Sequence, residues 1–332
     1  MPDAPEPRPL VAATLPTLHF IGVSTRQSSI MRIFPAWAEA LELGPCAING
    51  IDLELHAPAA AYREVVAFIR DDALSRGALV TAHKIDLLHA SADLFDELDP
   101  HAAALREVSC LSKRNGKLVG HAKDPISATL ALDAILPSSH WRDHDSADAL
   151  LLGAGGATTA ISQTLMQAAR AEGGPRRIVV TDVREDRLRA LRRFHDTMPG
   201  RTTGTAVEYV LTNGTAEADA ILDTLGEGSL VVNASGLGKD RPGSPLGPRA
   251  RFPHRGVAWE LNYRGDLLFL DAAEAQAAER ALRTVDGWNY FLHGWTRVIA
   301  EVFDMAIPTT GPGFERLSAL AGGAPRRAGA AP

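Results

Sequence analysis

The chain has 332 residues, of which 45% are hydrophobic and 22% charged, and its formal net charge is −6. This balance is typical of a globular protein of one or two domains and argues against a wholly disordered chain. Its two cysteines, Cys46 and Cys110, cannot form a disulfide framework, and no apolar run reaches the roughly 18 residues needed to cross a membrane. An acidic chain does not favour nucleic acid as a partner, and an acidic, proline-rich start unlike a signal peptide indicates a cytoplasmic protein.

Apolar periodicity predicts an α/β domain in the first half of the chain. Residues 1–16 are rich in proline and lack periodicity, so we expect a flexible tail there, and another over residues 311–332. Between the tails the predicted elements are, in chain order, strand 19–23, helix 31–43, strand 48–55, helix 60–75, strand 78–81, a hairpin turning at 114–116 and helix 126–135. Strands that alternate with helices in this way indicate a largely parallel sheet.

The polar, turn-rich stretch at 137–147 is the predicted boundary of a second α/β domain. After it the pattern predicts, in chain order, strand 149–152, helix 156–171, strand 177–181, helix 185–195, strand 206–211, helix 216–225, strands 229–233 and 257–261, helix 272–281 and helix 290–305. This order is typical of a Rossmann-type, doubly wound sheet.

A glycine-rich turn follows the first strand of this second domain and reads Gly153-Ala154-Gly155-Gly156-Ala157. Glycines allow a tight turn whose backbone amides approach a pyrophosphate, and the next helix adds a partial positive charge at its N-terminus. Asp182 ends the following strand, where a carboxylate can bind ribose hydroxyls and would repel a 2′-phosphate, so we expect NAD rather than NADP. Arg184 could still accommodate NADP, and an ordinary turn with Asp182 as a helix cap remains the structural alternative.

Two polar residues of the first half stand next to predicted elements. Lys84 follows a buried strand in Gly77-Ala78-Leu79-Val80-Thr81-Ala82-His83-Lys84, and Asp124 precedes a helix in Gly120-His121-Ala122-Lys123-Asp124. The later motifs are the glycine loop, Asn233-Ala234-Ser235-Gly236-Leu237-Gly238 and Asp286-Gly287-Trp288. The order of these motifs over about residues 17–306 resembles the shikimate/quinate dehydrogenase family.

The resemblance implies a substrate-binding domain at 17–136 and 288–310 and an NAD(P)-binding domain at 137–287, with Asn233 and Gly238 at the cofactor. It also implies that Lys84 and Asp124 flank the reacting hydroxyl. Hydride transfer to or from an alcohol carbon needs a proton moved at oxygen, and a desolvated Lys can shuttle it. Only five of the 34 basic residues are Lys, and Arg cannot serve near neutral pH. A solvated Lys84 and a capping Asp124 are the structural alternatives.

The positions that contact substrate in the family are partly changed here. Those that match it are Ser28, Thr81 and Tyr263, while Ser109, Ala122 and His293 stand in place of Asn, Asn and Gln. Each lost amide removes hydrogen bonds to ring hydroxyls, so shikimate itself should bind less well. We therefore expect a less polar or larger cyclic hydroxy or keto compound, of shikimate-, quinate- or cyclitol-like type, bound by a monomer or homodimer.

Two other functions stay open. A methylene-tetrahydrofolate dehydrogenase-like enzyme also joins a Lys-bearing domain to a dinucleotide domain, but the Asp124 and Asn233 motifs fit it less well. A catalytically weak, dinucleotide-binding sensor or partner subunit would account for the changed substrate positions, yet it has little use for a Lys–Asp pair. We expect no metal, because His140 and His144 have suitable spacing but no third ligand nearby.

Overall fold

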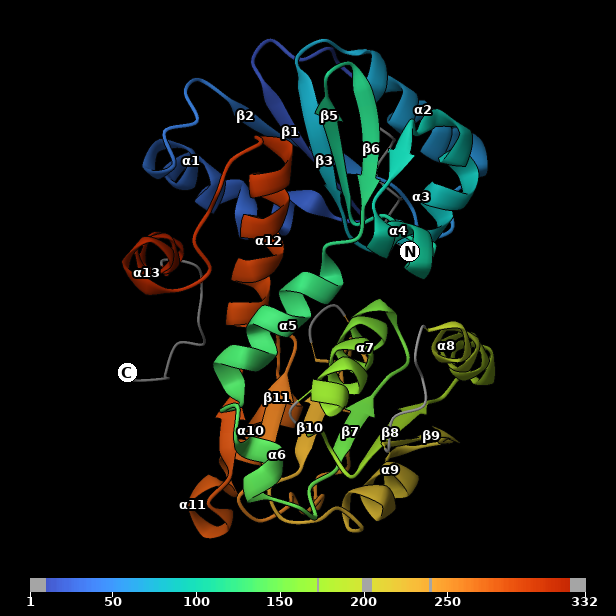
Figure 1. The fold of residues 1–332 in the computed structure, drawn as a ribbon, viewed down its shortest axis with the longest axis vertical. Helices are drawn as coiled ribbons and strands as arrows, with labels where there is room; N and C mark the ends of the chain where they lie inside the picture. The colour runs from blue at the N-terminus through green and yellow to red at the C-terminus, as the bar shows by residue number, and fades with distance from the viewer. Residues whose placement is uncertain (1–9, 172, 199–204, 239–240, 323–332) are drawn as a thin grey trace. The chain divides into compact units, whose positions relative to one another are not determined.

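The computed structural model describes residues 10–171, 173–198, 205–238 and 241–322 (Figure 1). The described residues form two compact units. Of the described residues, unit 1 holds 10–123 and 294–322, and unit 2 holds those within Asp124–His293. Among the described residues, no helix combines the length and the apolar character that a membrane crossing requires.

Unit 1 is built on a six-stranded mixed sheet. Its strands are β1 (Thr17–Gly22), β2 (Ala47–Asp52), β3 (Ser75–Val80), β4 (Glu97–Leu98), β5 (Cys110–Arg114) and β6 (Lys117–His121), in the order β2-β1-β3-β5-β6-β4. β1 pairs in parallel with β2 and β3, whereas β5 runs antiparallel to both β3 and β6. The predicted hairpin at 114–116 is confirmed, and its turn has positive φ at Asn115 and Gly116.

Helices complete unit 1. They are α1 (Ile30–Ala40), α2 (Ala59–Asp71), α3 (Lys84–Ser91), α4 (Pro100–Leu105), α13 (Gly311–Ala321) and the part of α12 (Trp288–Val302) from Gly294 on, with 3₁₀ turns η1 (Thr25–Gln27) and η2 (Ala92–Leu94). The helix α2 forms because Val65, Val66 and Ile69 recur on one face, and these side chains bury against Ile21 and Leu111 of the sheet. The short helices α3 and α4 were not predicted.

The prediction of a flexible tail is wrong for residues 311–321, which form the helix α13. Leu317 and Ala321 are buried, and the indole Nε1 of Trp37 in α1 donates a hydrogen bond to Leu317 O at 2.8 Å. This segment is therefore held by a contact with a residue that lies 280 positions earlier in the chain. The predicted tails at 1–9 and 323–332 lie outside the described residues.

Unit 2 contains the parallel sheet that the second half of the sequence predicts. Its strands are β7 (Ala149–Leu152), β8 (Arg177–Asp182), β9 (Ala206–Leu211), β10 (Leu230–Asn233), β11 (Val257–Glu260) and β12 (Arg283–Val285), in the order β12-β11-β10-β7-β8-β9. All the pairings are parallel, and the chain changes direction across the sheet at β7, which lies between β8 and β10. The predicted α/β fold class with a Rossmann-type second domain is confirmed.

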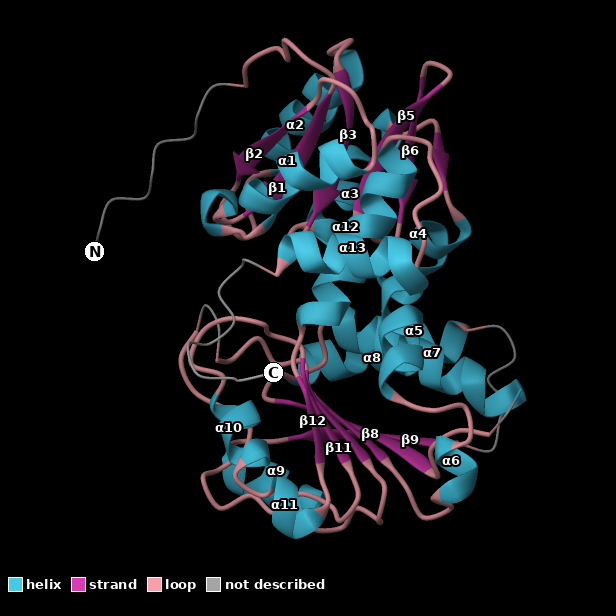
Figure 2. Ribbon diagram, turned by 90° about the vertical axis from the view of Figure 1, so that its left-hand side faces the viewer, coloured by secondary structure: helices cyan, strands magenta, loops and turns pink. Residues whose placement is uncertain are grey.

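Helices cover both faces of this sheet (Figure 2). They are α5 (Asp124–Ile135), α6 (His140–Asp143), α7 (Gly156–Ala171), α8 (Glu185–Thr197), α9 (Thr215–Leu222), α10 (Leu268–Glu274) and α11 (Ala277–Arg280). Ala149 and Leu151 of β7 face the layer of α5, α7 and α8, while Leu150 and Leu152 face α9 and α10. Burial on both faces explains why β7 is a continuous apolar run.

The compact units differ from the predicted domains at α5. The sequence places this helix before the boundary at 137, whereas Ala128, Ala131 and Ile135 pack in the same core as Ile161 of α7, within unit 2. The predicted helix at 272–281 is also divided, because Ala275 and Gln276 form a turn between α10, which begins at Leu268, and α11.

Candidate functional site

In unit 1, three predicted site residues lie together at the carboxyl edge of the sheet. Thr81 directly follows β3, Lys84 begins α3, and Ser109 directly precedes β5. Val80 N donates to Ser109 O at 2.9 Å, and Val108 N donates to Lys84 O at 3.2 Å. The backbone therefore ties the end of β3 and the start of α3 to the strand that carries Ser109.

The loop after β1 brings Ser28 to the same edge. Thr25 donates from both its backbone N and its Oγ1 to Asp52 Oδ1, at 2.8 and 2.6 Å, which holds this loop against the end of β2. Ser28 N then donates to Thr25 O at 3.0 Å. Thr81 N and Oγ1 both donate to Ile21 O, at 3.0 and 3.2 Å, so β1 and β3 are joined where they end.

Lys84 is half-buried, and a buried histidine fixes the turn in front of it. His83 Nδ1 lies 3.1 Å from Tyr62 Oη of α2, and the His83 side chain is fully buried. Burial lowers the pKa of His83, so its ring is neutral at neutral pH. The first turn of α3 therefore carries Lys84 and Asp86 next to a neutral His83 ring. Asp124, its predicted partner, is the half-buried first residue of α5 in unit 2.

In unit 2, the glycine loop follows β7 and leads into α7, as predicted. Gly153 has φ +104, and a Cβ there would lie 2.7 Å from Ser235 Cα, so only glycine fits this close approach. Gly153 N donates to Thr181 O at 2.8 Å, which holds the loop against β8. A Cβ on Gly155 would meet nothing within 4 Å, so the middle of the loop borders open space.

Asp182 lies at the carboxyl end of β8 and is 6% exposed. Its Oδ2 accepts from Ala154 N at 2.7 Å, and its Oδ1 accepts from Arg184 N at 2.8 Å. Each carboxylate oxygen has a second lone pair, so these bonds leave acceptor capacity for hydroxyl groups. The Arg184 guanidinium is engaged by Asp186, with Nη2 to Oδ2 at 2.6 Å.

Asn233 and Gly238 bound a loop that a buried carboxyl group supports. Asn233 Nδ2 donates to Glu260 Oε2 at 2.6 Å, and Asn262 donates to Glu260 Oε1 from its backbone N and its Nδ2, at 2.8 and 2.7 Å. Both amides also donate to Leu237 O. Burial raises the pKa of Glu260 to about 7, against the opposing effect of these amide donors.

The importance of Glu260 was missed at the sequence level. It ends a short apolar strand, and a single acidic residue in that place reads as an ordinary solvent-facing strand end. The one available signal was the pair of asparagines, Asn233 and Asn262, at the ends of two neighbouring strands.

Tyr263 and His293, both predicted to contact substrate, lie in unit 2. The Tyr263 ring packs against Trp288 and Phe291 of α12, with ring centroids 5.3 and 4.6 Å away. His293 lies on the same helix and is 2% exposed. The aromatic contacts fix the orientation of Tyr263, and the substrate contacts of both residues stay predictions.

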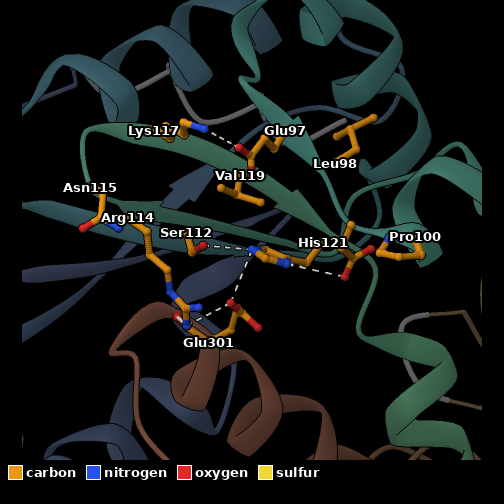
Figure 3. Close-up of a pocket in the computed structure, with 11 residues that line it drawn as sticks. Glu97, Leu98, Pro100, Ser112, Arg114, Asn115, Lys117, Val119, His121 and Glu301 are labelled. Atoms are coloured by element: carbon orange, nitrogen blue, oxygen red, sulfur yellow. Dashed lines mark hydrogen bonds and ion pairs between the residues drawn. The ribbon is translucent and has the colours of Figure 1, made fainter.

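Unit 1 also contains a cavity of about 500 Å³ that the sequence did not suggest (Figure 3). It is lined by Glu97, Leu98, Asp99, Pro100, Ser112, Arg114, Asn115, Lys117, Val119, His121 and Glu301. Ser112 Oγ lies 2.8 Å from His121 Nε2, and Asp99 Oδ2 lies 3.4 Å from His121 Nδ1. None of the predicted catalytic, substrate or cofactor residues lines this cavity.

The charged groups around this cavity are paired with one another. Glu301 of α12 accepts from the buried Lys123 Nζ at 2.6 Å, and its Oε1 forms an ion pair with Arg114 Nη2 at 3.1 Å. Lys117 pairs with Glu97 at the rim. A network of ion pairs therefore lines the cavity and links β4, β5 and β6 to α12 within unit 1.

Curated proteins that resemble this chain include shikimate dehydrogenases. No family model matches the chain. A shikimate dehydrogenase (NADP(+)) of Bacillus cytotoxicus is 36% identical over 124 residues, and the match spans 36% of this chain but only 41% of that enzyme. A shikimate dehydrogenase (NADP(+)) of Brucella canis is 28% identical over 245 residues, which cover 70% of this chain and 71% of the relative.

Solved structures share the fold over nearly the whole chain. A quinate dehydrogenase from Corynebacterium glutamicum, solved in complex with NAD, superposes with a TM-score of 0.67 at 20% identity. The superposition covers 92% of this chain and 98% of that protein. At this identity the superposition establishes a common fold.

Proposed function

We propose that this chain is an oxidoreductase of the shikimate/quinate dehydrogenase family. Its sequence relatives and its fold support this proposal. It transfers hydride between a nicotinamide dinucleotide and a cyclic hydroxy or keto compound of shikimate-, quinate- or cyclitol-like type. The observation that carries this proposal is the glycine loop 153–157, placed between β7 and α7 where the strand order of the parallel sheet reverses. Crevices outside the carboxyl ends of strands at such a point are where dinucleotides bind.

The residues of unit 2 fit a dinucleotide. The open space beside Gly155 would admit a pyrophosphate to the backbone amides of the loop and to the N-terminus of α7. Asp182 retains acceptor capacity for the hydroxyls of a ribose. Asn233 and Gly238 would border the other half of the cofactor, which supplies the hydride acceptor or donor when bound.

We propose NAD in preference to NADP. The Asp182 carboxylate is fixed by two backbone amides at the ribose position, where its charge would repel a 2′-phosphate. Arg184, which could have offset this repulsion, is occupied by Asp186. Replacing Asp182 with Ala should reduce the preference for NAD over NADP by at least tenfold, measured as the ratio of dissociation constants. An unchanged ratio would contradict the cofactor assignment.

Lys84 and Asp124 are the residues proposed to handle the proton. An ammonium at a half-buried helix start can give a proton to a developing alkoxide or take it from a hydroxyl, and a carboxylate orients both. Ser28, Thr81 and Ser109, at the same edge of the unit 1 sheet, would bind the substrate together with Tyr263 and His293. Ser109 Oγ already accepts from Lys123 N at 2.7 Å, so the hydroxyl hydrogen remains available to a ligand.

Turnover against a panel of cyclic hydroxy compounds tests this function. Shikimate, quinate, aminoshikimate and several cyclitols would be offered with NAD⁺ and NADP⁺ while reduced cofactor is followed at 340 nm. We expect turnover of a panel member, with shikimate a poor substrate. Lys84→Ala should lower kcat at least a hundredfold, which is the usual contribution of a positioned acid–base group. Lys117→Ala, which removes an exposed ion pair with Glu97, should leave kcat unchanged.

The alternative function is a dinucleotide-binding sensor or partner subunit with weak catalysis. The replacement of two amide side chains by Ser109 and Ala122 favours it, because these buried positions offer fewer hydrogen bonds to a polyol. Tight binding of NAD(H) without turnover of any panel member would support this alternative. Full activity of the Lys84→Ala variant would remove Lys84 from the mechanism.

A further inference from the structure

Glu260 is a carboxyl group with no exposed surface at the carboxyl end of β11. Three amide N–H groups point at its oxygens, at 2.6 to 2.8 Å, and they come from Asn233 and Asn262. An ionised carboxylate accepts all three bonds, whereas a protonated carboxyl must turn one oxygen into a donor. The hydrogen-bonding pattern is therefore that of a buried anion.

No cation neutralises this anion among the described residues. Described charged side chains on the adjoining loops, on α10 and on β12 include Arg241, Arg264, Asp266, Asp271, Glu274, Arg283 and Asp286. Within the part of the chain that the structure describes, none of them forms a hydrogen bond or an ion pair with Glu260, whose hydrogen-bond partners there are Asn233 and Asn262. A carboxylate that is held by amides but lacks a counter-ion exerts its field on whatever lies next to it.

The position of Glu260 relates this field to the proposed cofactor. The Rossmann-type sheet has two halves, and the loop of β7 with Asp182 of β8 marks the half that binds adenosine. β10, β11 and β12 form the other half, outside which the nicotinamide end is bound. Asn233 and Asn262 also donate to Leu237 O, at 3.3 and 2.9 Å, so the same amides shape the 234–238 loop at this edge.

We propose that Glu260, held as an uncompensated anion by Asn233 and Asn262, makes the nicotinamide half of the site prefer the oxidised cofactor. The oxidised ring carries a positive charge and the reduced ring is neutral, so a nearby fixed negative charge stabilises only the first. This inference rests on the proposed dinucleotide site. It assigns to Glu260 a role in cofactor selection that its packing alone would not produce.

Binding measurements with three probes test the proposal. The dissociation constants of NAD⁺, NADH and ADP-ribose, which lacks nicotinamide, would be measured by calorimetry for the wild type and for Glu260→Gln. We expect the variant to bind NAD⁺ about tenfold more weakly relative to NADH, while ADP-ribose affinity changes by less than twofold. The ratio of NADH to NAD⁺ dissociation constants is the deciding quantity, because a general loosening of the loop weakens both forms equally.

The dependence on pH gives a second reading of the same ratio. Since burial raises the pKa of Glu260 to about 7, the preference for NAD⁺ should grow as the pH rises from 6 to 8 in the wild type and stay flat in Glu260→Gln. Glu260→Asp, which keeps the charge, should retain most of the preference and provides the test if the Gln variant does not fold.

Failure of this inference and failure of the proposed function would give different binding results. Equal loss of NAD⁺ and NADH affinity in Glu260→Gln would show a merely structural role and overturn the inference. Wild-type protein that binds none of the three probes, nor NADP⁺, would overturn the proposed function as well.

Discussion

Buried histidines show how single residues set the pH range in which the fold is stable. His19 of β1 is 1% exposed, and its Nε2 lies 2.8 Å from Ser75 Oγ of β3. Burial lowers the pKa of His19 to about 4, with only partial opposition from the charge of Asp72. The folded protein therefore holds this ring in its neutral form at pH values where an unfolded chain would protonate it.

This shift predicts a loss of stability in mild acid. Between pH 6.5 and about 4 the unfolded chain binds a proton at His19 that the folded chain does not, so stability falls as the pH falls through this window. The loss attributable to His19 should reach up to about 3 kcal/mol. Urea unfolding at pH 7 and pH 4.5 measures it, and His19→Gln should reduce the difference between the two pH values. His89→Gln, at an exposed position, is the control and should leave that difference unchanged.

At the scale of elements, one ion pair joins α12 to the end of β6. Lys123 and Glu301 side chains are 10% and 17% exposed, and their charged atoms lie 2.6 Å apart. Burial alone would raise the pKa of Glu301, but hydrogen bonding to Lys123 and the charges of His121, Lys123 and Arg114 hold it below its usual value. The carboxylate is thus stabilised in its ionised form.

Removing this carboxylate should destabilise unit 1. Glu301→Gln removes the carboxylate that lies 2.6 Å from the buried Lys123 ammonium, which keeps Asp99 Oδ2 at 4.0 Å, and we expect a loss of about 3 kcal/mol at pH 7. Because the folded-state pKa is lowered, the contribution exists above pH 4.5 and disappears as the pH falls below it, so variant and wild type should converge in acid. A double variant, Glu301→Gln with Lys123→Met, should regain part of the loss. Equal unfolding free energies of the single variant and the wild type at pH 7 would contradict this account.

Two glycines of one loop should respond differently to the same substitution. Gly153→Ala places a Cβ against Ser235 Cα at a φ of +104, so we expect a loss of about 2 kcal/mol in stability and weakened NAD⁺ binding. Gly155→Ala meets no atom within 4 Å, so it should fold normally yet weaken NAD⁺ binding, because its methyl group enters the proposed phosphate space. Thermal unfolding with and without NAD⁺ separates the two effects. Normal NAD⁺ affinity in Gly155→Ala would argue against a phosphate at this loop.

The elements show where sequence reasoning succeeds and where it stops. Five strands of unit 2, β7 to β11, were predicted to within a residue because each is a short apolar run between polar turns, and β7 and β9 match in full, whereas the edge strand β12 was not predicted. The helix α13 was missed because glycine and proline dominate the composition of its surroundings, and its order depends on Trp37 far away in the chain. Local patterns cannot reveal an element whose stability comes from a distant partner.

The same limit applies to the sites. The glycine loop and Asp182 are local features, and the structure joins them through the Ala154 N to Asp182 bond. The environment of Glu260 needs the ends of two parallel strands, and the cavity around His121 needs α12 beside β6, so neither follows from spacing along the chain. Sequence reasoning therefore found residues that act within one motif and missed groups assembled by the sheets.

At the scale of the whole molecule, each unit has its own core. The core of unit 1 joins α2 and α3 to β3 and β5, and that of unit 2 has a layer on each face of its parallel sheet. The proposed cofactor residues all lie in unit 2, while Ser28, Thr81, Lys84 and Ser109 lie in unit 1. Damage to the core of unit 1 should therefore affect turnover before it affects dinucleotide binding.

Removing α13 tests this separation. A chain that ends at Thr310 loses the burial of Leu317 and Ala321 and the hydrogen bond from Trp37, so unit 1 should lose about 3 kcal/mol of stability. Its dissociation constant for NAD⁺ should stay within twofold of the wild-type value, because the glycine loop and Asp182 belong to the other core. Trp37→Phe removes the hydrogen bond together with part of a fully buried ring, and should cost at least about 1 kcal/mol. If the shortened chain were as stable as the full one, α13 would not be an integral part of unit 1. If the shortened chain lost NAD⁺ binding while still folded, the two cores would not act separately.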